Sequence, residues 1–231
     1  MANPLHNRRA LVTGGSSGIG YAIAEKLAVN GIVVTVADVA CPPLLAPNIQ
    51  YRYCDVSKGE DIDNLYNSML PELPQILILC AGKGIHERLT EGDPEKWADL
   101  LNVNVMGILR CIRAFVPYMQ DQKQGNVVII SSVAAQKVYD YGGVYAASKA
   151  AVNSIAETLR IETMPHVAVT TIMAGMTNTN FLKDRPDIPH LKQTTGSLNA
   201  MDIADDVFYA ISKPGGSVIN VITARPSGQV F

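Results

Sequence analysis

A glycine-rich turn between a short apolar strand and a helix constrains the fold of this chain more than any other stretch. The apolar residues 10–12 run directly into Thr-Gly-Gly-Ser-Ser-Gly-Ile-Gly at residues 13–20, and apolar residues at helical spacing follow as far as Gly31. Residues 32–37 then form a continuous run rich in β-branched residues, typical of a strand buried on both faces of a parallel sheet, which closes on Asp38. The pattern predicts a βαβ unit that binds a dinucleotide.

The chemistry of this unit favours one cofactor. Glycines allow a sharp turn and the close approach of a pyrophosphate to backbone N–H groups, and the helix N-terminus adds partial positive charge. Asp38 can accept hydrogen bonds from both hydroxyls of an adenosine ribose and would repel a 2′-phosphate. No Lys or Arg lies in the turn, and Val39 follows the acid. We therefore expect NAD rather than NADP, with contacts from Gly14, Ser16, Ser17, Gly18, Ile19 and Gly20.

The rest of the chain alternates predicted strands with predicted helices. This order indicates one α/β domain over residues 1–231, with a doubly wound, Rossmann-like parallel sheet and helices on both faces. Later strands are expected at residues 49–54, 76–79, 127–130, 167–173 and 217–222, and helices near residues 61–69, 93–119, 145–159 and 202–211. The polar stretch at about residues 178–200 is long for a connection, which predicts a substrate lid.

Composition excludes several classes of protein. The formal net charge of −2 gives no basic surface for a nucleic-acid partner or an anionic membrane. The four cysteines, Cys41, Cys54, Cys80 and Cys111, lack the spacing of metal ligands, so we expect reduced thiols, no metal site and no disulfide framework. No signal core precedes the first strand and no apolar run is judged long enough to span a membrane, which favours a cytoplasmic location.

A tyrosine and a lysine one helical turn apart form the second informative motif. Residues four apart share a helix face, so the Tyr145 phenol and the Lys149 ammonium can point into one cleft. A phenol titrates near a pKa of ~10 and needs a nearby positive charge to act as an acid or base at neutral pH. This spacing alone is more typical of a solvated helix face. The glycine turn, Gly82, Ser132 and Thr177, however, all follow predicted strands, where open α/β sheets bind ligands.

With these motifs the chain resembles the classical short-chain dehydrogenase/reductase family over essentially its full length. The resemblance is carried by residues 13–20, Asn102-Val-Asn104, Ser132 and Tyr145-Ala-Ala-Ser-Lys149, in that order. It implies that Tyr145 is the general acid/base that interconverts a secondary alcohol and a ketone or aldehyde. It also implies that Ser132 hydrogen-bonds the substrate oxygen, that Lys149 binds the nicotinamide ribose and lowers the tyrosine pKa, and that Asn104 holds a water linking Lys149 to solvent.

The same resemblance implies the remaining cofactor contacts and the assembly. Asp55 and Val56 would flank the adenine, and Ala81 and Gly82 the adenosine ribose. Thr177 would bind the carboxamide, with Gly175 also in contact with the cofactor. Family members commonly form homodimers or homotetramers through the helix of residues 97–119 and the Tyr145 helix.

Some positions depart from the family pattern or leave alternatives open. Leu79-Cys80 stands where the family usually has two asparagines, and Ala174 where it usually has proline; we expect cofactor affinity and lid geometry to be affected more than catalysis. Ser131 and Ser132 point in opposite directions on an extended strand, and the family motif selects Ser132. His86, His166 and His190 are interpreted as loop residues, of which His190 in the lid could touch substrate.

Three functions are compatible with these motifs. The first is an NAD-dependent alcohol dehydrogenase or carbonyl reductase acting on a small molecule. The second is a carbonyl reductase that prefers NADP, and the third is a non-catalytic dinucleotide-binding sensor. The residues expected to choose the substrate lie at 183–200 and in the turns near Lys83, Ala134 and residues 139–144.

Overall fold

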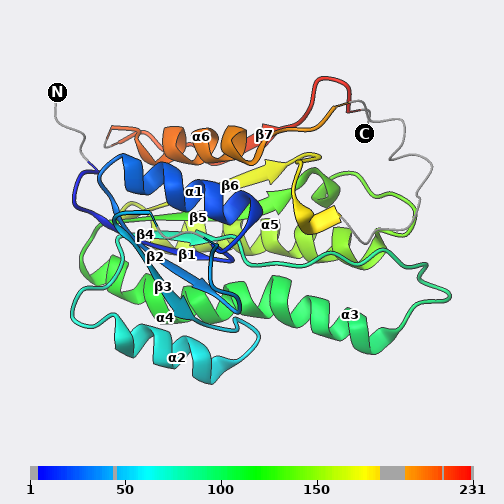
Figure 1. Ribbon diagram of the computed structural model, residues 1–231, viewed down its shortest axis with the longest axis horizontal. Coiled ribbons are helices and arrows are strands. Elements are labelled where there is room, and N and C mark those ends of the chain that lie inside the picture. The colour runs from blue at the N-terminus through cyan, green and yellow to red at the C-terminus, as the bar shows by residue number, and fades with distance from the viewer. Residues whose placement is uncertain (1–4, 44–45, 183–195, 215, 230–231) are drawn as a thin grey trace.

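The computed structural model describes residues 5–43, 46–182, 196–214 and 216–229, and places one parallel sheet between two layers of helices (Figure 1). The strand order is β3-β2-β1-β4-β5-β6-β7, so the order reverses on either side of β1 as in a doubly wound fold. The strands are β1 Arg9–Thr13, β2 Val33–Asp38, β3 Ile49–Tyr53, β4 Ile76–Leu79, β5 Gly125–Ser132, β6 Val167–Ala174 and β7 Val221–Ala224. The predicted fold class is confirmed.

Each face of the sheet has its own core. Helices α1 (Gly18–Val29) and α6 (Ala200–Ile211) pack together on one face. Helices α2 (Gly59–Ser68), α4 (Gly107–Asp121) and α5 (Gly143–Thr163) cover the other face, and α3 (Pro94–Leu101) leads into α4. All four residues of β4 are buried, and they alternate between the two cores, which explains the continuous apolar run in the sequence.

The helix predicted from Asp93 to Met119 contains a break in its winding. A π-helical segment, Asn102–Met106, lies between α3 and α4, and the N–H of Gly107 bonds to the carbonyl of Asn102. Such segments often occur at functional sites. Asn104 lies in this segment and is fully buried, so its amide is not the exposed bystander that helical periodicity alone would favour.

The last strand is shifted from its predicted position at residues 217–222 to Val221–Ala224. Its register against β6 pairs Thr171 with Val221 and Ala174 with Ala224. Residues 219 and 220 precede the ladder. The carbonyl of Ile219 accepts a hydrogen bond from the Thr170 hydroxyl, and the carbonyl of Asn220 accepts from both the Thr171 N–H, at 2.9 Å, and the Arg160 guanidinium.

The sequence analysis expected no apolar run long enough to span a membrane, and one helix departs from this expectation. By length and composition, the helix of residues 94–121 could cross a membrane, and 39% of its most apolar window is buried. Its side chains Ile108, Phe115 and Met119 pack in the core beneath the sheet, while Arg110 donates hydrogen bonds to the carbonyls of Val56 and Asn102. In this fold the segment serves as a core helix that leaves one apolar side exposed.

Candidate active site

The carboxyl ends of the strands surround one cavity of about 710 Å³, a size that fits a dinucleotide cofactor with a small substrate. The predicted site residues in its wall are Gly14, Ser17, Gly18, Ile19, Gly20, Asp38, Asp55, Val56, Ala81, Gly82, Ser132, Tyr145, Lys149, Gly175 and Thr177. Ser16 and Asn104 lie behind this wall. Segments far apart in the sequence thus converge at the edge of the sheet where ligands were expected.

The glycine turn is shaped by backbone contacts. Gly14 has φ +67°, and a Cβ there would lie 2.6 Å from the Cα of Ala81. A Cβ on Gly20 would lie 2.1 Å from the carbonyl oxygen of Gly14. The turn therefore closes against the end of β4 and against its own helix, and it brings the N-terminus of α1 to the cavity wall. This arrangement fits a pyrophosphate.

Asp38 is held beside this turn at the end of β2. Its Oδ2 accepts the N–H of Ser16 at 3.0 Å, and its Oδ1 accepts the N–H of Ala40 at 3.1 Å. The Ser16 hydroxyl donates to the carbonyl of Ala40, so Ser16 positions the carboxylate from behind. Each carboxylate oxygen keeps a further lone pair for a ribose hydroxyl.

The adenine end also holds Asp55. Burial raises the pKa of this carboxyl, but hydrogen bonds from the hydroxyl and N–H of Ser57, at 2.7 and 3.0 Å, outweigh burial and lower it. The Asp55 carboxylate is therefore charged and fixed where the resemblance implies an adenine contact.

The Leu79-Cys80 departure is compensated by Thr13. The Thr13 hydroxyl donates to the carbonyl of Ile78 and accepts the N–H groups of Cys80 and Ala81 at 3.2 and 3.3 Å. It thereby joins β1 to β4 without an asparagine side chain. Burial raises the pKa of the Cys80 thiol to about 12, so Cys80 contributes a neutral side chain to the cavity wall.

Tyr145 and Ser132 face the cavity from α5 and β5. Burial raises the pKa of Tyr145 to about 12; interaction with the Ser132 hydroxyl lowers it, but by less. Ser132 also accepts the N–H of Ala134 at 3.1 Å, whereas the Ser131 hydroxyl donates to the backbone carbonyl of Lys149. Ser132 is thus the serine that interacts with the phenol. Its predicted hydrogen bond to the substrate oxygen stays a prediction.

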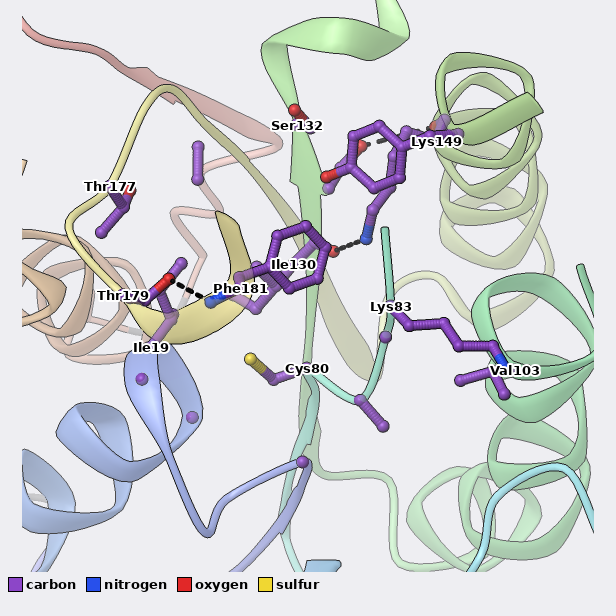
Figure 2. A pocket seen from close by; sticks show the side chains of 18 of the residues that line it. Ile19, Cys80, Lys83, Val103, Ile130, Ser132, Lys149, Thr177, Thr179 and Phe181 are labelled. Carbon is purple, nitrogen blue, oxygen red and sulfur yellow. Dashed lines mark hydrogen bonds between the residues drawn. The ribbon is translucent and has the colours of Figure 1, made fainter. Parts of the chain in front are cut away.

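Lys149 lies deeper in the same wall. Its Nζ donates to the carbonyl of Ile130 at 3.0 Å and lies 5.9 Å from the ring centroid of Tyr145 (Figure 2). Burial lowers the pKa of Lys149 to about 8. The expected lowering of the tyrosine pKa by Lys149 is therefore not seen, because burial dominates both groups and favours the neutral form of each.

Asn104 connects the catalytic helix to the loop after β4. Its Oδ1 accepts the N–H of Lys83, and its Nδ2 donates to the carbonyl of Lys83, both at 2.9 Å. Nδ2 also lies 3.1 Å from the Ser148 hydroxyl, which donates to the carbonyl of Tyr145 at 2.7 Å. Ser148 is thus buried and makes local hydrogen bonds rather than facing the cavity. Both polar atoms of the Asn104 side chain already hydrogen-bond to protein groups. The water that Asn104 is expected to hold therefore stays a prediction.

Several cavity residues were missed by the sequence. Thr179 and Phe181 lie across the cavity from Lys149 (Figure 2), and the Phe181 ring is 5.9 Å from that of Tyr145. The hydroxyl of Thr177 donates to the carbonyl of Gly175 at 3.0 Å, and Thr177 is buried whereas Thr179 is half-buried. Thr179 is therefore a second candidate for the carboxamide. The motif at 174–179 contains both threonines, and their spacing alone did not separate them.

A polar pair completes the substrate side. His86 Nε2 lies 3.2 Å from the Tyr139 hydroxyl, and both residues line the cavity. His86 follows β4 and Tyr139 follows β5, positions that could have marked both as site residues. Tyr139 falls in a stretch that the sequence assigned to substrate choice, whereas His86 was interpreted only as a loop residue. His190 and most of the predicted lid lie outside the described residues.

Metal chemistry is not indicated by the side chains that the structure describes. Within those ranges, no three His, Cys, Asp or Glu residues gather closely enough to hold a metal ion. The chemistry available at the cavity is therefore that of a phenol, a hydroxyl and an amine beside a dinucleotide site.

Known proteins share both the sequence and this geometry. A family profile described as short chain dehydrogenase matches residues 8–188. An uncharacterized oxidoreductase of Staphylococcus saprophyticus is 35% identical, with 96% of this chain and 98% of the relative covered. An alcohol dehydrogenase from Thermococcus sibiricus, complexed with 5-hydroxy-NADP, has a TM-score of 0.85 at 25% identity, over 97% of this chain and 99% of its own.

A second solved structure widens the range of substrates among the relatives. A serine dehydrogenase complexed with NADP+ has a TM-score of 0.88 at 26% identity, covering 96% of each chain. The family profile spans most of the sequence, and the glycine turn and the Tyr145-Lys149 pair lie within it. The chain therefore belongs to the short chain dehydrogenase family and is an oxidoreductase with a Rossmann-like fold.

Proposed function

We propose that this oxidoreductase uses NAD to interconvert a secondary alcohol and a ketone or aldehyde, with Tyr145 as the general acid/base. The observation that carries the proposal is that Tyr145, Ser132 and Lys149 converge at one end of a cavity whose other end is formed by the glycine turn and Asp38. A cofactor bound along this cavity would place its reactive ring beside the phenol.

The protein's own groups then have defined tasks. In carbonyl reduction, Tyr145 gives its proton to the carbonyl oxygen, and Ser132 donates a hydrogen bond that orients this oxygen. The raised pKa of Tyr145 keeps the phenol protonated for this step. In alcohol oxidation, Tyr145 must act as a phenolate, which the charges of Lys149 and an oxidised nicotinamide favour. When bound, NAD supplies the hydride chemistry.

NAD is proposed over NADP because of Asp38. Both of its carboxylate oxygens are fixed by backbone N–H groups at the place of the adenosine ribose, and its neighbours in the cavity wall are Ala37 and Val39. A 2′-phosphate there would meet a negative charge without a cation beside it in the motif. The second candidate is an NADP-preferring carbonyl reductase, since two solved relatives carry NADP-type cofactors.

The test combines binding with turnover. We expect the wild-type protein to bind NAD more tightly than NADP, and Asp38→Ala to reverse this order. Across a panel of small alcohols and ketones, Tyr145→Phe should lower turnover ~10²- to 10⁴-fold while NAD affinity is kept. An unchanged rate in Tyr145→Phe would contradict the proposal. Tight NAD binding without hydride transfer to any compound would favour a non-catalytic sensor.

We also propose a homodimer or homotetramer. The long helix exposes Leu101, Met106 and Leu109, and helix α5 exposes the small residues Ala147 and Ala150. An exposed apolar face beside a face of small side chains allows close helix packing between copies. Light scattering of the purified protein measures this directly, and a monomer at working concentrations would exclude it. The cytoplasmic location stays a prediction.

A further inference from the structure

The loop that leaves β6 is fixed almost entirely by its backbone. The N–H of Gly175 donates to the carbonyl of Ala224 at 2.7 Å. On its other side, the N–H of Leu198 donates to the carbonyl of Met176 at 2.9 Å, and the N–H of Asn178 to the carbonyl of Leu198 at 2.8 Å. The loop of residues 175–178 is thus held between two segments that arrive from later parts of the chain.

One side chain from a distant segment completes this arrangement. The Oε1 of Gln229 accepts the N–H of Met176 at 3.0 Å, and Gln229 itself is half-buried in the cavity wall. Among the described residues, Gln229 supplies the only hydrogen-bond acceptor for the Met176 N–H. If Gln229 were lost, this N–H would be left unpaired in a partly enclosed wall. The bond therefore ties the turn of residues 225–229 to the loop that carries Thr177.

The turn that presents Gln229 has its own fixed shape. The N–H of Gln229 donates to the carbonyl of Pro226 at 3.0 Å, and the Arg225 guanidinium donates to the carbonyl of Gln229 at 2.6 Å. Pro226 is buried. These contacts preset the position of the Gln229 side chain, so little side-chain entropy opposes the bond to Met176.

Gly175 shows how closely the turn presses on the loop. A Cβ at this position would lie 2.5 Å from the Oε1 of Gln229 and 2.7 Å from the Cβ of Arg225. Only a glycine allows this approach. Ala174 precedes it, and alanine does not restrict its own backbone as proline does. The turn packed against Gly175 therefore adds a further restraint to a loop that has no proline at its start.

We propose that Gln229 is a positioning residue for the nicotinamide end of the cofactor, acting through the Met176 N–H to hold residues 175–177 in place. The inference rests on the proposed function, because it needs NAD to lie along this cavity. Gln229 touches the loop rather than the reacting atoms, so its loss should weaken the nicotinamide end of the site and leave the adenosine end unchanged.

The experiment compares two ligands that differ only at that end. ADP-ribose lacks the nicotinamide ring, and NAD contains it. By titration calorimetry, Gln229→Ala should raise the Kd for NAD about 3- to 10-fold, the loss expected for one hydrogen bond, and leave the Kd for ADP-ribose within about twofold. Gln229→Glu keeps an acceptor oxygen and should restore most of the NAD affinity. Gln122→Ala, at an exposed position after α4, is the matched control.

The outcomes separate this inference from the proposed function. If the wild-type protein binds neither ligand, the proposed function is contradicted and the inference falls with it. If the wild type binds NAD and Gln229→Ala binds it equally well, only the inference is overturned. Equal weakening of both ligands would also overturn it, because that result indicates a general structural role.

Discussion

The two ends of the cavity are built in different ways. The end proposed to bind adenosine and pyrophosphate comes from one continuous βαβ unit, residues 9–38, with Asp55 and Val56 added from the next strand's loop. The end proposed for catalysis, called the catalytic end below, gathers side chains from the loops after β4, β5 and β6 and from the turn at Gln229. The first end is formed by the backbone of one local segment, whereas the second depends on contacts between segments that are far apart in the sequence.

This difference determines what each end tolerates. At Gly14 and Gly20 in the glycine turn, the close neighbours are backbone atoms that cannot move aside. At the catalytic end, the neighbours are side chains, and the buried groups Tyr145 and Lys149 have pKa values displaced by burial. Substitutions that add atoms should therefore disrupt the first end through steric clashes. The second end should be sensitive to the loss of a charge or of a single hydrogen bond.

Among the substitutions that compare the two ends of the cavity, the largest effect is expected from Gly20→Ala. Its new Cβ would lie 2.1 Å from the Gly14 carbonyl oxygen and 2.8 Å from the Gly14 carbonyl carbon, so the turn must open. We expect a loss of about 1–3 kcal/mol in the free energy of unfolding, or a comparable loss of NAD affinity of roughly 10- to 100-fold. Urea denaturation and NAD titration measure the two contributions.

Gly59→Ala is the matched control for this substitution. Gly59 begins α2, and a Cβ there meets no atom within 4 Å. Because alanine favours helix more than glycine does, the unfolding free energy should stay equal or rise by up to about 1 kcal/mol. If Gly20→Ala behaves like Gly59→Ala, the steric account of the pyrophosphate end is wrong.

The second prediction tests the electrostatic character of the catalytic end. Burial lowers the pKa of Lys149 from 10.5 to about 8. Between these values the unfolded chain keeps a proton on this amine that the folded protein has lost, so the free energy of unfolding rises with pH. Lys149→Met removes this dependence. From about pH 7 to about pH 10, wild type should gain on the order of 2 kcal/mol relative to the variant.

Urea denaturation at several pH values measures this difference, and other titrating groups largely cancel because both proteins contain them. Lys96→Met, at an exposed position, controls for loss of a lysine as such. A constant difference between wild type and Lys149→Met across this range would mean that the buried amine keeps its ordinary pKa. The proposed electrostatic difference between the two ends of the cavity would then be wrong.

The same contrast explains what the sequence could predict. Residues 13–20 and Asp38 are close in sequence, and their spacing reports a local backbone geometry, so the strand, turn and helix of that end could be predicted from the sequence. Gln229 and Met176 are 53 positions apart, and no periodicity records such a contact. The role of Ser16 was also missed, since only the structure shows its N–H and hydroxyl turned toward Asp38 and Ala40 rather than into the cavity.

Motif spacing likewise could not distinguish side chains of similar chemistry. Thr177 and Thr179 follow the same strand, and the hydrogen bond from Thr177 to Gly175 appears only when the loop is folded. The displaced pKa values of Tyr145 and Lys149 depend on how much of the domain covers them, which is a property of the whole fold. The sequence could therefore predict side chains that line the cavity, such as Tyr145 and Lys149, but not their electrostatic state.

The smallest effect is expected at the polar pair on the substrate side. The pair places an imidazole and a phenol 3.2 Å apart in the cavity wall, where they can orient a polar group of the substrate without touching the cofactor. For the best substrate in the panel, His86→Ala should raise KM about 3- to 10-fold, as expected for one hydrogen bond, and leave the Kd for NAD unchanged.

Tyr139→Phe should act similarly, and the increase in KM of the double variant should be smaller than the product of the two single increases, because each residue orients the other. His166→Ala, at an exposed position before β6, should match wild type. If the KM increases of the two single variants simply multiply in the double variant, or if NAD affinity falls in parallel, these residues do not form one substrate-recognition unit. The catalytic end would then not include this part of the cavity wall.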